Sequence, residues 1–210
     1  MHNRRKSHWT FVAGLLAALA TPAVAAPAVP APPPAAGQPT WAEFNALTTL
    51  AYRFAECLDK SRWDEMRSLF APQVDVDTTA TGNSSVHKVR TAEEHVWHVK
   101  IQETGFDGTL LLLGNPQVSV TGDTAEATFT FYGEHVAAVA AGDNFYTIGG
   151  YQSFHFRRTA GRWLIDGFRL TPTWQKGNRE IMAIGIRRGL ERLTARKDPP
   201  PADIVQAMHW

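Results

Sequence analysis

A histidine and a glutamine interrupt two strand faces that are otherwise apolar, and both side chains can hold or move a proton. His135 ends an alternating segment in which Phe129 and Phe131 share its face, and Gln152 shares a face with Phe154. Burying an imidazole or an amide costs free energy unless each polar atom finds a partner. The pattern therefore indicates either a polar-lined cavity, or a core histidine and a core glutamine that bond each other or the backbone.

Two further side chains are candidates for contacting a ligand. Tyr146 shares the inward parity of Gln152 and presents a hydroxyl group, and His98 lies one helical turn after His95 on a predicted helix. Only one of the two histidines needs to face inward. No His-x-x-x-His pattern or third ligand at suitable spacing occurs near them, so we predict no metal site. The sequence also has no Gly-rich phosphate loop, and we predict no cofactor.

The elements that would position these residues begin with helices. Apolar residues recur at helical spacing from Phe44 to Leu58, and a short second helix over 63–70 is stopped by Pro72. Thr91 and Glu94 form a capping-box pattern, in which Thr91 caps the amides and Glu94 reaches back. This pattern opens a third helix that runs to about residue 102.

The second half of the chain alternates as strands. We predict a first strand around Val74 and Val76, and later strands over 109–113, 117–120, 125–136, 145–157 and 162–170. Turn signals separate the later ones, among them Gly114-Asn115-Pro116. Helix returns after Asn178. Helices that are segregated from a run of antiparallel strands define an α+β fold.

The first forty residues read as export and linker sequence. A basic segment with Arg4 and Arg5, a short apolar stretch and the small-residue site Ala23-Val24-Ala25 predict a signal peptide over 1–25, processed by the general secretory route rather than the twin-arginine route. We expect a periplasmic or secreted protein with no stable membrane insertion after cleavage. An Ala/Pro-rich linker over 26–40, one domain over 41–197 and a tail over 198–210 complete the predicted organisation.

Charge argues against nucleic acid as a partner. The chain has 21 Lys+Arg and 20 Asp+Glu, and losing Arg4, Arg5 and Lys6 leaves 18 basic against 20 acidic residues, with no basic stripe. Cys57 is the single cysteine, so no internal disulfide can form.

Two segments carry a family resemblance. The first runs from Cys57 to Pro72, "CLDKSRWDEMRSLFAP", and the second contains "GRWLIDGFRL" followed by Trp174. Together they resemble the SnoaL-like branch of the NTF2-like superfamily, which includes scytalone dehydratase. The resemblance implies a cone-shaped fold, in which a curved antiparallel sheet wraps around helices and encloses one pocket. It also implies a homodimer or higher homo-oligomer. Tyr132 and Tyr151 are expected on the outer face of the sheet and would suit such an interface.

The resemblance assigns roles to several residues. Asp59 matches an acid at the end of the first helix that holds a sheet histidine, here His135. Gln152 stands where those enzymes carry Asn, and His98 lies near a third-helix position that contacts ligand. A carboxylate orients an imidazole and raises its basicity, so this pair is suited to acid–base chemistry.

The chain also departs from the dehydratases. Leu58 and Thr78 replace tyrosines, and Leu111 replaces a histidine, so scytalone dehydration itself is not expected. The pocket wall would be more apolar, with Thr78 and Leu111 as ligand contacts. Two functions stay open: a cofactor-free lyase or isomerase acting on a small apolar cyclic substrate, or a non-catalytic domain that binds a small apolar molecule in the same pocket.

Overall fold

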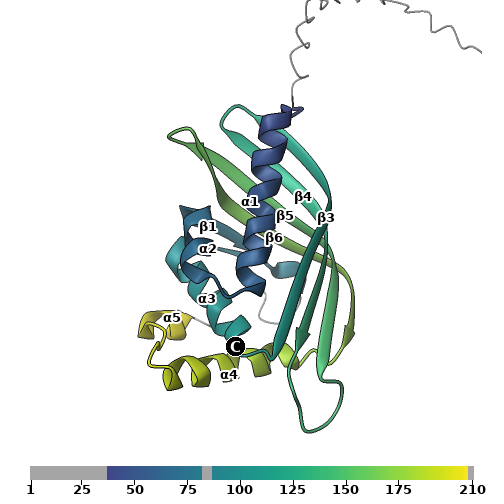
Figure 1. The fold of residues 1–210 in the computed structure, drawn as a ribbon, viewed down its shortest axis with the longest axis vertical. Coiled ribbons are helices and arrows are strands. Elements are labelled where there is room, and N and C mark those ends of the chain that lie inside the picture. The colour runs from purple at the N-terminus through teal and green to yellow at the C-terminus, as the bar shows by residue number, and fades with distance from the viewer. Residues whose placement is uncertain (1–36, 82–86, 208–210) are drawn as a thin grey trace, which may run out of the picture. The chain divides into compact units, whose positions relative to one another are not determined.

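The computed structural model describes residues 37–81 and 87–207, and it shows helices packed against one face of a curved sheet (Figure 1). The helices are α1 (Trp41–Asp59), α2 (Trp63–Leu69), the 3-10 turn η1 (Thr79–Thr81), α3 (Ala92–Thr104), α4 (Ile181–Ala195) and α5 (Ala202–Ala207). The strands are β1 (Phe70–Asp77), β2 (His87–Thr91), β3 (Gly108–Thr121), β4 (Thr124–Val136), β5 (Phe145–Thr159) and β6 (Arg162–Gly177). This is the α+β fold that the sequence predicts.

The six strands form one sheet in the order β2-β1-β6-β5-β4-β3. Its neighbouring strands are antiparallel except β1 and β6, which are parallel because the chain passes through β2, α3 and the β3–β5 meander before β6 returns beside β1. The long strands β3 to β6 are antiparallel neighbours joined by turns. They form the curved wall that faces the helices.

The first helix is well specified at its start. The Thr40 side chain accepts the Glu43 N–H while the Glu43 carboxylate accepts the Thr40 N–H, a complete capping box. Helix α3 has only half of the predicted box. Thr91 caps the Glu94 amide at 3.1 Å, but the Glu94 carboxylate contacts Lys88 instead of reaching back.

The division of β3 differs from the sequence prediction. Gly114-Asn115-Pro116 was expected to be a turn between two strands, yet β3 is continuous and only shifts register between Gly114 and Gln117. The reason is that β4 is long enough to pair with both halves. Pro116 has no N–H for the ladder, and Asn115 adopts φ +51°, so the three residues form a bulge.

The predicted parity of the strands is confirmed. Phe129, Phe154 and Phe156 are fully buried between the sheet and α1, where the Phe54 ring packs edge-on to Phe154. Outward residues such as Glu126 are exposed. The inward faces of β4 and β5 thus form the main core with the apolar stripe of α1.

Helix α4 packs on α3 through glycines. A Cβ at Gly189 would lie 1.7 Å from the Ile101 carbonyl oxygen, and one at Gly105 would lie 1.6 Å from the Gly185 carbonyl oxygen. The backbones therefore touch directly, and any side chain there would separate them. None of the helices in the described residues has the length and apolarity needed to cross a bilayer.

Candidate functional site

His135 lies in a buried corner where the ends of β3 and β4 meet the end of α3. Its direct cross-strand partners are Thr109 on β3 and Tyr146 on β5. The His135 Nδ1 atom lies 3.3 Å from the Thr109 hydroxyl and 3.9 Å from Glu103 Oε2. The register of three strands thus places a hydroxyl, an imidazole and a phenol in one row.

Aromatic rings enclose the histidine. The Phe106 ring lies 4.7 Å from the imidazole centroid, and the Tyr146 ring is nearly parallel to it at 6.5 Å. Because this environment excludes water, burial lowers the pKa of His135 to about 4, although the nearby Glu134 carboxylate favours the charged form. The imidazole is therefore neutral at pH 7 and available as a proton acceptor.

Glu103, in the last turn of α3, is a site residue that the sequence reasoning missed. Its side chain is 4% exposed, and Oε2 has no hydrogen-bond partner within the described residues. Burial raises the pKa of Glu103 to about 7, and the Asp59 carboxylate adds to this rise. Hydrogen bonding from Thr109 and Gln102 offsets part of it.

Asp59 occupies the end of α1, as predicted, but its hydrogen bond goes to β3. Its Oδ1 atom accepts the Leu111 N–H at 3.0 Å. Within the described residues no hydrogen bond joins Asp59 to His135, whose neighbouring carboxyl is Glu103. One oxygen of the Asp59 carboxylate thus binds the β3 backbone, and the pairing of Asp59 with His135 stays a prediction. Burial raises the pKa of Asp59, and the Leu111 bond opposes that rise.

Gln152 is buried on the inner face of β5, as its parity predicts. It is 1% exposed, and its Nε2 atom has no hydrogen-bond partner among the described residues. It does not bond to His135, whose partners lie toward the other end of the strands. An amide that is buried and unpartnered in this way is a candidate to bind a ligand oxygen or a water molecule.

Both histidines of α3 face inward. His95 packs edge-on against Phe70 at 5.0 Å, and neither of its ring nitrogens has a partner within the described residues. His98 is slightly more exposed, and its Nε2 lies 3.9 Å from Glu94 Oε1. Burial lowers the pKa of His95 to about 3 and that of His98 to about 4. His95 is thus a core residue, and His98 is the better placed of the two for a ligand.

The remaining predicted contacts are spread along the sheet. The Tyr146 hydroxyl donates to Gln175 Oε1 at 2.7 Å, and burial raises its pKa. Leu111 packs on the main core. Thr78 lies in the turn after β1, where its carbonyl oxygen accepts the Thr81 N–H at 2.9 Å. The structure thus gathers Asp59, Leu111, Tyr146 and His135 around β3 to β5, while Thr78 belongs to the β1 side of the sheet.

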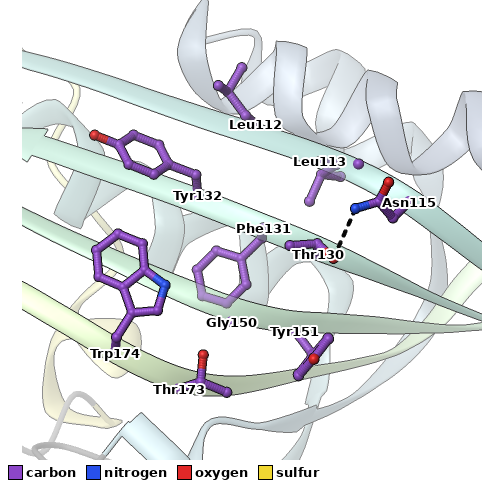
Figure 2. Close-up of a pocket in the computed structure, with 11 residues that line it drawn as sticks. Leu112, Leu113, Asn115, Thr130, Phe131, Tyr132, Gly150, Tyr151, Thr173 and Trp174 are labelled. Atoms are coloured by element: carbon purple, nitrogen blue, oxygen red, sulfur yellow. Dashed lines mark hydrogen bonds between the residues drawn. The ribbon is translucent and has the colours of Figure 1, made fainter.

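Two shallow hollows lie on the outer face of the sheet, and they share Tyr132 and Trp174. Figure 2 shows the residues that line the first of them. Their volumes are about 350 and 430 Å³. Leu112, Tyr132, Gly149 and Trp174 are in register across four strands, and the indole lies over Gly149, where a Cβ would come within 2.4 Å of it. Leu112 and Trp174 are 53% and 48% exposed, so the outer face has an apolar patch that parity alone did not reveal.

No group of three or more His, Cys, Asp or Glu residues within 37–81 and 87–207 has metal-binding geometry. The pocket inside the curve of the sheet stays a prediction. What the structure shows in the interior is a set of buried polar side-chain atoms that have no hydrogen-bond partner among the described residues.

A family model for the SnoaL-like domain matches residues 41–169, more than half of the chain. None of the curated proteins matches this sequence. Solved structures match in fold. The Kfla4162 protein from Kribbella flavida has a TM-score of 0.62 at 18% identity, over 68% of this chain and 97% of that one.

Two other similar structures carry the names of enzymes. A proposed scytalone dehydratase from Novosphingobium aromaticivorans has a TM-score of 0.55 at 16% identity, over 66% of this chain and 89% of that one. The hexachlorocyclohexane dehydrochlorinase LinA-type3 from Novosphingobium barchaimii has a TM-score of 0.52 at 12% identity, over 66% and 91%. Identities this low establish the fold alone.

The chain therefore belongs to the SnoaL-like family, within the NTF2-like fold. The buried corner around His135 brings together an imidazole, a hydroxyl and a carboxyl group.

Proposed function

We propose that this protein is a cofactor-free lyase or isomerase that acts on a small, largely apolar cyclic substrate, with His135 as the proton-transferring residue. The observation that carries the proposal is the neutral, buried imidazole of His135, enclosed by Phe106 and Tyr146 with a carboxyl group beside it. A buried imidazole that is neutral at pH 7 can accept a proton without first losing one.

In the lyase reaction, His135 would take a proton from a ring carbon. The electron pair left behind would form a carbon–carbon double bond, as a leaving group departs with its own bonding pair. In an isomerisation the imidazolium would return the proton to another atom of the substrate. The names of two structural neighbours, a dehydratase and a dehydrochlorinase, describe eliminations of the first type and support the proposal.

Selectivity would come from an apolar wall with few polar contacts. Phe129, Phe131 and Phe154 supply aromatic surface. Gln152 and His98 supply buried nitrogen atoms that have no hydrogen-bond partner within the described part of the chain. Such a wall suits a small ring that bears one or two oxygens or other polar substituents.

The test is a two-part measurement. Mass spectrometry of the natively purified protein would identify a small molecule that co-purifies, and a panel of cyclic alcohols, ketones and halides would then be assayed for elimination or isomerisation. Replacing His135 with Asn should lower turnover by roughly 10²–10⁴-fold. The matched control is His155→Gln, an exposed histidine on the outer face of the same sheet, which should keep full activity. Equal rates for His135→Asn and the natural protein would contradict the proposal.

A non-catalytic binding domain is the second candidate. Its support is that the side chain beside Asp59 on β3 is Leu111, which cannot exchange protons, so one catalytic histidine of the dehydratases is missing from the wall. Saturable binding of a ring compound without turnover, unaffected by His135→Asn, would favour this function.

We also propose that the mature protein is exported and self-associates. The basic and apolar segments before Ala26 support export, and the exposed apolar patch around Leu112 and Trp174 supports a homodimer or a higher homo-oligomer.

A further inference from the structure

Glu103 is a carboxyl group that its surroundings neither pair with a cation nor expose to solvent. Lys and Arg side chains make no ion pair with it in the described residues, and the basic side chain that lies within 4 Å of it there is His135. The Oε2 atom that points to His135 is the oxygen that lacks a hydrogen-bond partner. Burying a carboxyl group without a partner costs free energy, so its position beside the imidazole points to a role for the pair.

Thr109 connects the two groups. Its hydroxyl lies 3.3 Å from His135 Nδ1, and Thr109 is also close enough to Glu103 to lower the pKa of that carboxyl. Because Thr109 and His135 are direct cross-strand partners, the sheet register fixes this hydroxyl on the same face as the imidazole. The three side chains come from α3, β3 and β4, so their approach is a product of the tertiary fold.

We propose that Glu103 is the carboxyl partner of His135, and that the two groups share a proton through Nδ1, with Thr109 holding them together. Glu103 is then a positioning residue that acts through His135, the role that the family resemblance gives to Asp59. Asp59 instead fixes β3 through Leu111. This inference rests on the proposed function for its catalytic meaning, but the pairing itself can be tested without a substrate.

The charges around the pair favour this assignment. The titratable groups nearest to the pair are Asp59 from α1, Glu134 from β4 and Tyr146 from β5. Burial raises the pKa of Glu103 to about 7 and lowers that of His135 to about 4, so the carboxyl is the group of the pair that titrates near neutrality. When Glu103 is ionised, it can accept the Nδ1–H of the imidazolium that forms as Nε2 takes a proton.

The distance of 3.9 Å between Nδ1 and Oε2 is longer than a hydrogen bond. In free enzymes such contacts are often loose and tighten when substrate binds. The Glu103 Oε2 atom has no hydrogen-bond partner among the described residues and can accept the His135 Nδ1–H, whereas Oε1 already accepts from Gln102 at 3.3 Å.

The test is an NMR titration of the full-length mature protein, with labelled histidine and glutamate side chains, between pH 4 and 9. In the natural protein one Glu carboxyl should titrate near pH 7, and the His135 ring signals should shift in the same step. Glu103→Gln should abolish both events while it preserves shape. The matched control is Glu134→Gln, which removes the carboxylate next to His135 in sequence. That residue faces outward and accepts the Tyr132 hydroxyl, so the step near pH 7 should persist.

A second variant guards against a folding defect. Thr109→Val keeps the β-branched shape and removes the connecting hydroxyl, so the His135 step should change in size or position. The pairing is overturned if His135 responds to Asp59→Asn but not to Glu103→Gln or Thr109→Val.

Activity adds a separate readout. If Glu103 positions His135, Glu103→Gln should lower kcat by roughly 10²-fold with little change in KM, and the rise of activity through pH 7 should disappear. A residue with only a structural role would leave the shape of the pH profile unchanged. If the NMR coupling is present and His135→Asn retains full activity, the pairing stands and the proposed function fails.

Discussion

The carboxylate of Asp59 accepts the backbone N–H of Leu111 at 3.0 Å and so joins the end of α1 to the first part of the edge strand β3. The bond connects residues far apart in the chain and lies in a part-buried position. It leaves the acid with a structural role that sequence comparison alone would not assign.

Asp59→Ala should therefore reduce stability. Removing an acceptor that bonds a part-buried N–H should cost roughly 1–3 kcal/mol in the free energy of unfolding, because the Leu111 amide loses its partner. Asp59→Asn keeps a carbonyl oxygen and should cost less. Urea unfolding of the three proteins measures the difference. If alanine and asparagine gave equal stabilities, the Leu111 bond would have no energetic importance.

Buried histidines should make the protein sensitive to acid. The pKa of His95 is lowered in the folded state to about 3 from an ordinary 6.5, so the unfolded chain binds the proton more tightly. Stability contributed by the neutral form is present above pH 6.5 and is lost as the pH falls toward 3. His98 and His135 act in the same direction.

His95→Leu should flatten this dependence. Between pH 7.5 and 4.5 the variant should lose about 2–3 kcal/mol less unfolding free energy than the natural protein, at 1.36 kcal/mol per pKa unit. Urea denaturation at the two pH values measures it. His87→Gln, at an exposed histidine on the edge strand β2, is the control and should behave as the natural protein does. A parallel loss in His95→Leu would show that other groups govern acid unfolding.

Replacing Gln152 should change the free energy of unfolding and the affinity for a ligand in opposite directions. Its amide nitrogen is buried and has no hydrogen-bond partner in the part of the chain that the structure describes, so Gln152→Leu should raise the free energy of unfolding by about 1 kcal/mol or more. If the amide binds the ligand, the same change should weaken a cognate ring compound by roughly 10–100-fold, at 1.4 kcal/mol per tenfold. Calorimetry and denaturation on one preparation give both values. Unchanged affinity in a folded variant would make Gln152 a core residue only.

The outer apolar patch should mediate self-association. Trp174 borders both hollows of the outer face and Leu112 borders the first, so a charge at Leu112 would be desolvated in a face-to-face dimer. Leu112→Lys should shift sedimentation toward the monomer. Val89→Lys, at a 60% exposed apolar residue on β2, is the matched control and should leave the assembly intact. A natural protein that is monomeric at tens of micromolar, roughly what an interface of standard size resists, would refute the prediction.

Export should remove the first residues. We expect the mature chain to begin near Ala26, because the small-residue site Ala23-Val24-Ala25 follows the apolar stretch. These residues lie outside the part of the chain that the structure describes. N-terminal sequencing of the protein from the periplasm or medium checks this, and an intact Met1 in the membrane fraction would overturn it.

Strand parity was the most informative property of the sequence. It placed Phe129, His135 and Gln152 on the inner face because a strand alternates strictly, whatever it packs against. The same rule identified the outer face, though not its apolar patch. Trp174 lies beyond the predicted end of the last strand, and its contact with Gly149 depends on how β5 and β6 align.

Glu103 escaped notice for a different reason. Helix α3 lies between the sheet and α4 and buries residues on more than one face, among them His95, Ile101 and Glu103. A helix covered on several sides has no single apolar stripe, so its inward polar residues do not stand out. The available signal in the sequence was position, since Glu103 is an acid near the end of a helix, as Asp59 is at the end of α1.

The lack of a side chain at Gly185 on α4 leaves room for the Phe106 ring, which packs against His135 on β4. A Cβ there would lie 2.3 Å from the Phe106 ring, and that ring packs against His135. Gly185→Ala would thus push the Phe106 ring toward the His135 imidazole. Helix α4 lies beyond the segment that matches the family model, which ends at residue 169. The packing around His135 therefore depends on a helix that lies outside the segment matched by the family model.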